Sequence, residues 1–222
     1  MINTLDEYIC RSMPQWGDFT TNPNLRKKVD DAGNLLPFLG NTVVFLLDDE
    51  IKETLRQLQE SLYRAAPDML AKPLQMSTFH MTLHDLANGT PEQPGLQEYM
   101  GYTQERVLQI LPNWKNIPPL RMKTTWLFNM VNTSIVLGLK PADEESWRRL
   151  DEMYTTLEDV VRLGYALTPH ITMAYFLPGM YNLEQVQRLS AALRNVELEI
   201  ILEMKNLVLQ NFTDMNHYET VL

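Results

Sequence analysis

Short apolar runs alternate with amphipathic segments along the first half of the chain. Residues 42–47 (TVVFLL) form an unbroken run of β-branched and large apolar residues, as expected for a buried strand. The acidic stretch that begins at residue 48 opens a helix to about residue 66, with apolar side chains at spacings of three and four. Residues 76–86 predict the next strand, and residues 96–111 predict a helix that ends before Pro112.

The second half of the chain has a similar order of strands and helices. Residues 120–130 and 133–139 predict a hairpin that turns near Val131 and Asn132. Asp143 is the predicted N-cap of a long helix that has one apolar stripe. The remaining predicted elements are a strand at 167–176, a helix at 183–193 and terminal strands within 197–212 and 217–222.

This order of elements indicates a fold class. Helices interleaved with short strands and hairpins favour an α+β fold built on antiparallel sheets over a doubly wound parallel sheet. The strands at 76–86 and 167–176 hold corresponding places in the two halves, although the halves share no residue-level repeat. Residues 1–40 are irregular and punctuated by Pro and Gly, and we expect them to form an N-terminal arm packed on a single domain of residues 41–222.

Composition limits the class of protein. With 222 residues, 45% hydrophobic and 21% charged, the chain can bury a sizeable core. No apolar run approaches the roughly 20 residues that span a bilayer, and residues 1–12 lack the basic and apolar regions of a signal peptide. Cys10 is the only cysteine, so neither an intrachain disulfide nor a thiolate metal cage can form. We therefore expect a cytoplasmic protein with no membrane partner.

The net charge of the chain limits the classes of ligand that it is expected to bind. A formal net charge of −9 argues against broad binding to duplex DNA, because Lys and Arg contacts to phosphates supply most non-specific affinity. Net charge does not describe a local pocket, where two histidines and one or two cations could hold a single phosphate. A small or terminal phosphate ester is therefore still a candidate ligand.

The chemistry-bearing residues are concentrated in two short motifs. Of the four histidines, His80 and His170 each begin the pattern His, apolar, Thr, apolar, as HMTL and HITM. Side chains on a strand alternate between faces, so each histidine shares a face with the threonine two residues later, Thr82 or Thr172. Each strand can thus bury its apolar pair and present an imidazole and a hydroxyl toward a cleft.

Four polar groups from two strands suit a phosphodiester. An imidazole, with an ordinary pKa near 6.5, can be neutral on one strand and take a proton from the nucleophile. On the other strand it can be protonated and give a proton to the leaving oxygen. Threonine hydroxyls can donate hydrogen bonds to the non-bridging oxygens as charge builds on phosphorus. This chemistry needs no metal and no organic cofactor.

The two motifs resemble those of the two-histidine (2H) phosphoesterase superfamily, which includes the LigT-like RNA ligases and cyclic phosphodiesterases. Residues 168–175 (TPHITMAY) are similar to the second motif of that family, with a proline before the histidine, and residues 79–83 (FHMTL) are similar to the first. The resemblance implies a bilobal, pseudo-twofold fold of two antiparallel sheets flanked by helices, with the active-site cleft between them.

The resemblance also implies roles for the four residues. His80 and His170 would be catalytic, and Thr82 and Thr172 would bind phosphate. Which histidine is the base and which is the acid depends on the orientation of the substrate, so both assignments stay open. Residues 33–44 resemble a poorly characterised bacterial branch of the family, which leaves the physiological substrate open.

Further residues are weaker substrate-binding candidates. Tyr175 lies five residues after His170, on the opposite face of an ideal strand, but a bulge could turn it toward the cleft; core packing is the alternative. Lys123 on a predicted strand could bind phosphate, or it could be a solvated edge charge. Trp126 and Phe45 could line a base pocket, although aromatic residues in strands more often pack in the core.

A metal site is a less favoured reading of the first motif. His84 follows His80 by four residues, so both would face one side of a continuous strand and could form a metal pair. Pairs at that spacing usually lie on helices, and no obvious further ligands are present. Asp85 could orient a histidine, although it would lie on the face opposite His80.

We therefore predict metal-independent hydrolysis or transesterification of a phosphodiester, on a cyclic nucleotide phosphate or an RNA-terminal phosphate in RNA processing, by a monomer. One alternative is a non-catalytic nucleotide-binding protein of the same fold, although the presence of all four His and Thr residues argues against it. A second alternative is a metal-dependent hydrolase. A third is an RNA ligase, which the sequence does not distinguish from a hydrolase because both need the same phosphate-binding pair.

Overall fold

The structure is a computed structural model that describes residues 18–193 and 196–221; residues 1–17 of the predicted arm, Cys10 included, lie outside this part. Its helices are α2 (Asp49–Ala65), α3 (Leu96–Ile110), α4 (Glu144–Glu158) and α5 (Leu183–Ala192), with short 3-10 turns η1 (Pro23–Lys27), η2 (Met76–Thr78), η3 (Leu111–Trp114) and η4 (Met204–Asn206). Its strands are β1 (Phe19–Thr20), β2 (Leu39–Leu46), β3 (His80–Gly89), β4 (Leu120–Met130), β5 (Ser134–Pro141), β6 (His170–Tyr175), β7 (Met180–Tyr181), β8 (Glu199–Leu202), β9 (Leu207–Asp214) and β10 (His217–Thr220).

Eight strands form one antiparallel sheet in the order β10-β9-β2-β3-β6-β5-β4-β8. Its two halves meet at β3 and β6, where Met81 lies opposite Ile171 in a single registered pair. β2 and β5 flank these central strands in corresponding places, and β9 and β4 follow them. The predicted α+β fold with two antiparallel lobes is confirmed, and the two predicted sheets are the halves of one sheet.

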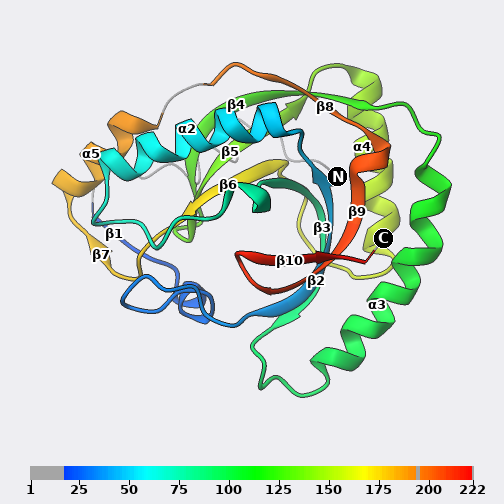
Figure 1. Cartoon of the computed structure of the whole chain (residues 1–222), viewed down its shortest axis with the longest axis horizontal. Helices are drawn as coiled ribbons and strands as arrows, with labels where there is room; N and C mark the ends of the chain where they lie inside the picture. The colour runs from blue at the N-terminus through cyan, green and yellow to red at the C-terminus, as the bar shows by residue number, and fades with distance from the viewer. Residues whose placement is uncertain (1–17, 194–195, 222) are drawn as a thin grey trace.

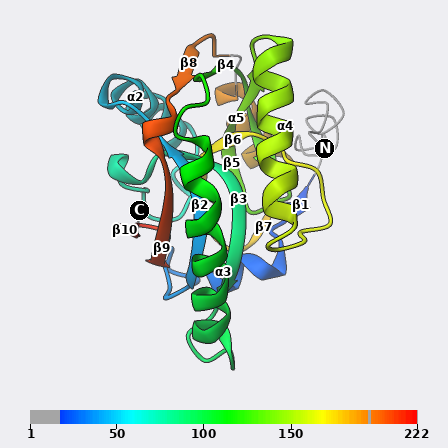
Figure 2. The ribbon, with the colours of Figure 1, turned by 90° about the vertical axis from the view of Figure 1, so that its right-hand side faces the viewer.

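Two of the helices pack over different parts of the sheet. α3 contacts β2, β3 and β9, whereas α4 contacts β4 and β5 and also reaches the central strand β3, and both helices face the viewer in Figure 2. α2 and α5 contact each other at the upper left of Figure 1, away from α3. The predicted apolar stripe of α2 is buried through Leu55, Leu58 and Leu62. Within residues 18–193 and 196–221, none of the helices combines the length and apolar character that crossing a bilayer requires.

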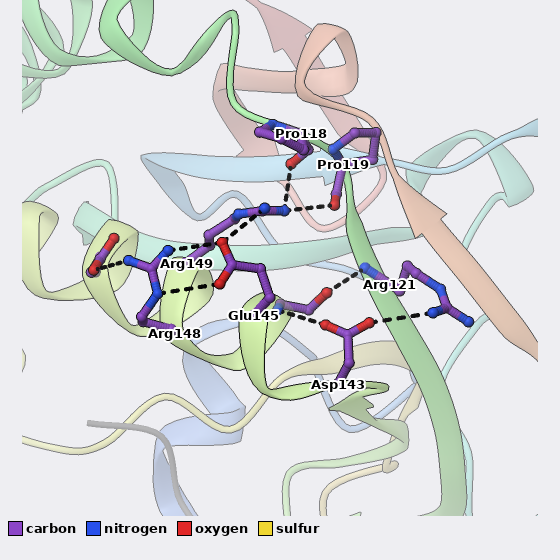
Figure 3. A network of polar contacts seen from close by, with 9 residues as sticks. Pro118, Pro119, Arg121, Asp143, Glu145, Arg148 and Arg149 are labelled. Carbon is purple, nitrogen blue, oxygen red and sulfur yellow. Dashed lines mark hydrogen bonds and ion pairs between the residues drawn. The ribbon is translucent and has the colours of Figure 1, made fainter.

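The N-terminus of α4 is fastened to β4 by the polar network in Figure 3. Asp143 accepts a hydrogen bond from the backbone N–H of Ser146 at 2.8 Å, as the predicted N-cap should. The Ser146 hydroxyl accepts one from the backbone N–H of Arg121 at 2.9 Å, and the Arg121 guanidinium bonds Asp143 and Glu199. The network continues through Glu145, Arg148, Arg149 and the carbonyls of Pro118 and Pro119.

Some predicted boundaries move because 3-10 turns redirect the chain. The predicted strand at 76–86 begins only at His80, since η2 precedes it. The region 197–212 divides at η4 into β8, which pairs with β4, and β9, which pairs with β2. These two pieces therefore lie in different halves of the sheet.

The described part of the arm is bonded to the sheet region at several points. β1 pairs with β7, and Asn22 donates its backbone N–H to the Asn132 carbonyl of the β4–β5 turn at 3.0 Å. Gly33, with a φ of +78°, accepts a hydrogen bond from the backbone N–H of Lys72 at 2.9 Å. These bonds fix the course of the chain between β1 and β2.

Gly40 lets β2 lie close to β3 and β9 at once. A Cβ atom at this position would overlap the ring of Phe212 and lie 2.5 Å from the Ala87 carbonyl oxygen and 2.8 Å from Asn88 Cβ. Two of these neighbours belong to the adjacent strand β3, and one of them is backbone, so they cannot move without disturbing the sheet.

We expect Gly40→Ala to lower the free energy of unfolding by about 1–3 kcal/mol through this overlap. Gly101→Ala is the matched control: Gly101 lies in the exposed part of α3, where a Cβ meets nothing within 4 Å. It should raise the free energy of unfolding by about 0.5–1 kcal/mol, because alanine favours the helix. Urea denaturation of both variants checks the pair, and equal effects would contradict the packing argument.

Candidate active site

The two predicted motifs lie on neighbouring strands of the sheet. β3 begins at His80 and β6 begins at His170. In each strand the histidine and the threonine are half-buried, whereas the apolar residue that follows each of them is fully buried. The predicted alternation of polar and apolar faces is therefore present in both strands.

The first motif strand contains an extra residue directly after its threonine. Thr82 lies opposite Val44 of β2, whereas His84 lies opposite Val43. Leu83 is therefore an additional residue on β3, and the register shifts by one. A β-bulge of this kind turns the side chains directly after it to the face opposite the one that strict alternation would give.

The second motif strand has its bulge at the same point. Thr172 lies opposite Val136 of β5, and Ala174 lies opposite Ile135, so Met173 is the additional residue. The bulge that was considered for Tyr175 is present. The two central strands thus share a sequence pattern, a burial pattern and a backbone irregularity.

Side chains from other elements satisfy backbone groups at both bulges. Gln59 of α2 donates its amide to the carbonyl of Met173 at 2.9 Å and to that of Leu74 at 3.1 Å. Thr42 of β2 donates its hydroxyl to the carbonyl of His84 at 3.1 Å. Because a buried carbonyl without a partner is costly, these bonds stabilise the irregular geometry.

The four side chains of the two motifs line one cavity of about 590 Å³. Asp85 and Tyr175, each five residues after its histidine, line it too, because the bulges turn them to that side. In the described part of the chain, the hydroxyls of Thr82 and Thr172 have no hydrogen-bond partner. The aromatic lining residues are Tyr154, Tyr165, Tyr175, Phe212 and Tyr218.

Backbone carbonyls orient both imidazoles. Nδ1 of His170 lies 2.7 Å from the carbonyl oxygen of Thr168, two residues earlier. A carbonyl only accepts, so this Nδ1 carries a proton and Nε2 is the nitrogen left for chemistry. His80 likewise has a hydrogen bond to the backbone of Thr78, two residues earlier, and its ring lies edge-on to Tyr218 at 5.1 Å between centroids.

Burial favours the neutral form of both histidines. It lowers the pKa of His80 to about 4, helped by the charges of His170 and Lys52. Burial also lowers the pKa of His170, but the Thr168 carbonyl and the negative charge of Asp85 oppose this shift. The two imidazoles therefore differ in their electrostatic surroundings although their strands correspond.

The predicted alternative of a metal pair at His80 and His84 is not supported by the geometry. Because of the bulge between them, the side chains of His80 and His84 do not lie on the same face of β3, and the His84 side chain is fully buried. Its Nδ1 lies 2.5 Å from the Asp85 carbonyl oxygen, and its Nε2 lies 3.2 Å from Glu158 Oε1. Both ring nitrogens are thus engaged within the fold.

The structure corrects the position of the predicted cation. Lys123 is exposed on β4, in register with Lys140 and Glu199, and is not among the residues that line the cavity. The cavity instead contains Lys28, which follows η1 in the arm. No periodic pattern marks Lys28, and the arm was expected only to pack on the domain.

The predicted aromatic candidates lie elsewhere as well. Phe45 is fully buried in the core, and Trp126 is exposed on β4. Neither residue lines the cavity. The aromatic rings that do so come from α4, from the segment before β6, and from β6, β9 and β10, which no local sequence pattern connects.

We expect the free energy of unfolding to fall as the pH falls from about 6.5 to about 4. The unfolded chain, with ordinary histidine pKa values, binds more protons in this window than the folded protein does. The contribution of His80 is about 3 kcal/mol, which is fully present above about pH 6.5 and is lost as the pH falls to about 4. Urea denaturation over this range checks it: the free energy of unfolding of His80→Gln should change less steeply with pH than that of the wild type. Parallel slopes for His80→Gln and wild type would contradict the assignment.

Several solved structures are similar to this one. The conserved protein of unknown function ATU0111 from Agrobacterium tumefaciens str. C58 is 19% identical, with 100% of this chain and 99% of that chain covered and a TM-score of 0.66. Escherichia coli LigT complexed with 3′-AMP is 14% identical, with 83% and 96% covered and a TM-score of 0.49. TT0787 of Thermus thermophilus is 14% identical, with 82% and 95% covered and a TM-score of 0.48.

Comparison of the sequence with known families and proteins does not assign the chain to a family. No protein-family model matches the chain, and no curated protein matches it in sequence. The likeness to ATU0111, which extends over the whole chain, shows that this chain shares its fold with a solved protein.

Proposed function

We propose that this chain is a metal-independent phosphodiesterase that acts on a cyclic nucleotide phosphate or an RNA-terminal phosphodiester. The proposal rests on one observation: two corresponding strands, each with the same bulge, present a histidine and a threonine to one cavity. The resemblance of both motifs to those of 2H phosphoesterases supports catalytic roles for His80 and His170. It supports phosphate binding by Thr82 and Thr172.

The chemistry can be written for a 2′,3′-cyclic nucleotide. One imidazole takes a proton from water as the water oxygen attacks phosphorus. The other, protonated imidazole gives its proton to the ribose oxygen as the bond from that oxygen to phosphorus breaks. One P–O bond forms and one breaks, which leaves a phosphate monoester and a free hydroxyl. The threonine hydroxyls donate hydrogen bonds to the non-bridging oxygens as negative charge builds.

The surroundings of the two histidines favour one assignment of these roles. Burial lowers the pKa of both histidines, but the charge of Asp85, which lines the cavity, opposes this for His170, whereas the charge of Lys52 adds to it for His80. These neighbouring charges favour a positive charge on His170 over one on His80. We assign His170 as the general acid and His80 as the general base.

The size of the cavity supports a small nucleotide or a short RNA end. A volume of about 590 Å³ falls in the range of roughly 300–1,000 Å³ that small-molecule sites occupy. Tyr165 lines the cavity and is 58% exposed, so its side chain presents an aromatic surface to a base. The formal net charge of −9 also disfavours a long polyanion.

We expect His80→Ala and His170→Ala each to lower kcat/KM for 2′,3′-cyclic nucleotides by at least about 100-fold, because each removes a proton-transfer group. Thr82→Val and Thr172→Val should lower it by about 10- to 100-fold, since each removes one hydrogen bond to the phosphate. Activity should persist in EDTA. Steady-state kinetics with the purified protein provides the measurement, and short RNAs with cyclic ends serve as second substrates.

The control variant is His217→Ala, which removes an exposed histidine that does not line the cavity. It should keep wild-type activity. Wild-type turnover by either cavity histidine variant would reject the two-histidine mechanism. Nucleotide binding without turnover by the wild-type protein would instead indicate a binding protein, and formation of joined RNA from cyclic ends would indicate a ligase.

A further inference from the structure

Lys28 is held in place by a network of backbone and side-chain bonds in the arm. Its backbone N–H donates to the Leu25 carbonyl at 2.8 Å, and its own carbonyl accepts from the N–H of Leu36 at 2.8 Å. The loop between these two contacts is closed by Asp30, whose carboxylate accepts hydrogen bonds from Ala32 and Asn34. The position of Lys28 is therefore built into the arm.

The ammonium group of Lys28 lies over two aromatic rings. It is 4.8 Å from the ring centroid of Phe38 and 5.8 Å from that of Tyr175. Tyr175 is the residue that the β6 bulge turns toward the cavity, and its hydroxyl donates to Met215 Sδ at 3.1 Å. Cation–π contacts of this kind direct the charge of Lys28 to the side of the cavity that β6 forms.

The charge of Lys28 is not neutralised by an ion pair with any carboxylate of the described residues. Of the nearby carboxylates, Asp31 pairs with Arg26 at 2.5 Å, and Asp30 is engaged in its own loop. Besides the histidines, the charged residues that line the cavity are Lys28 and Asp85. Among the described residues, Lys28 is thus the lysine or arginine that lines the cavity, and it has no ion-pair partner there.

We propose that Lys28 binds an anionic phosphate oxygen of the substrate, so that the arm takes part in substrate recognition. This inference rests on the proposed function of the same cavity. A general acid loses its positive charge when it gives up its proton, whereas a lysine keeps its charge throughout the reaction. Lys28 would therefore hold the phosphate before and after the proton has moved.

The first test is phosphate binding to the full-length protein, with Lys28→Met, Lys28→Arg and the control Lys27→Met. Lys27 is the adjacent residue, exposed and outside the cavity lining. Titration calorimetry with inorganic phosphate should show affinity about tenfold weaker for Lys28→Met and close to wild type for the other two. Thermal unfolding of each variant separates this from a structural role: a lower Tm for Lys28→Met with unchanged phosphate affinity would overturn the proposal.

The second test distinguishes two sources of the bound phosphate. Kinetics of Lys28→Met are compared on 2′,3′-cyclic AMP and on the same nucleotide with an added 5′-phosphate. A KM raised about tenfold on both substrates places the contact at the reacting phosphate, and a rise confined to the second places it at the 5′-phosphate. Wild-type KM values on both would overturn the proposal, even if the histidine variants are inactive. Phosphate binding that depends on Lys28 in a protein without turnover would uphold it and reject the proposed enzyme activity.

Discussion

The paired bulges at the centre of the sheet are the constraint on which the site depends. Without an extra residue after each threonine, strict alternation would turn Asp85 and Tyr175 away from the cavity. Each bulge needs a partner from another element, and Thr42 and Gln59 supply the hydrogen bonds. β2 and α2 therefore do more than cover the core, because they stabilise the backbone that faces the site.

The sequence predicted what depends on local periodicity and missed what depends on distant partners. Alternation within each motif is local, so the facing of His80 and Thr82 could be predicted correctly. The α+β class followed for the same reason, from the order of strands and helices. The register shift after Thr82 depends on pairing with β2, and η4 sends the pieces of 197–212 to different halves of the sheet. Neither feature has a signal in the chain itself.

The cation of the cavity shows the same limit. Lys123 was chosen because it lies on a predicted strand, but strand position does not determine which cavity a side chain reaches. Lys28 comes from an irregular arm whose course is set by bonds to distant residues, such as that between Gly33 and Lys72. Such contacts are visible only once the chain is folded.

Correspondence between the two halves explains the geometry of the site, and the departures from it explain how the site could work. Two equivalent imidazoles would accept a phosphodiester in either orientation, and acid and base would be interchangeable. The corresponding positions after the bulges hold different residues: Asp85 on β3 and Tyr175, with Lys28 over its ring, on β6. The negative charge of Asp85 lies on one strand and the positive charge of Lys28 lies beside the other, so the electrostatic potential differs between the two sides of the cavity. An anionic phosphate bound in such a field has a preferred orientation, and with His170 as the acid this orientation decides which ester bond of a cyclic phosphate breaks.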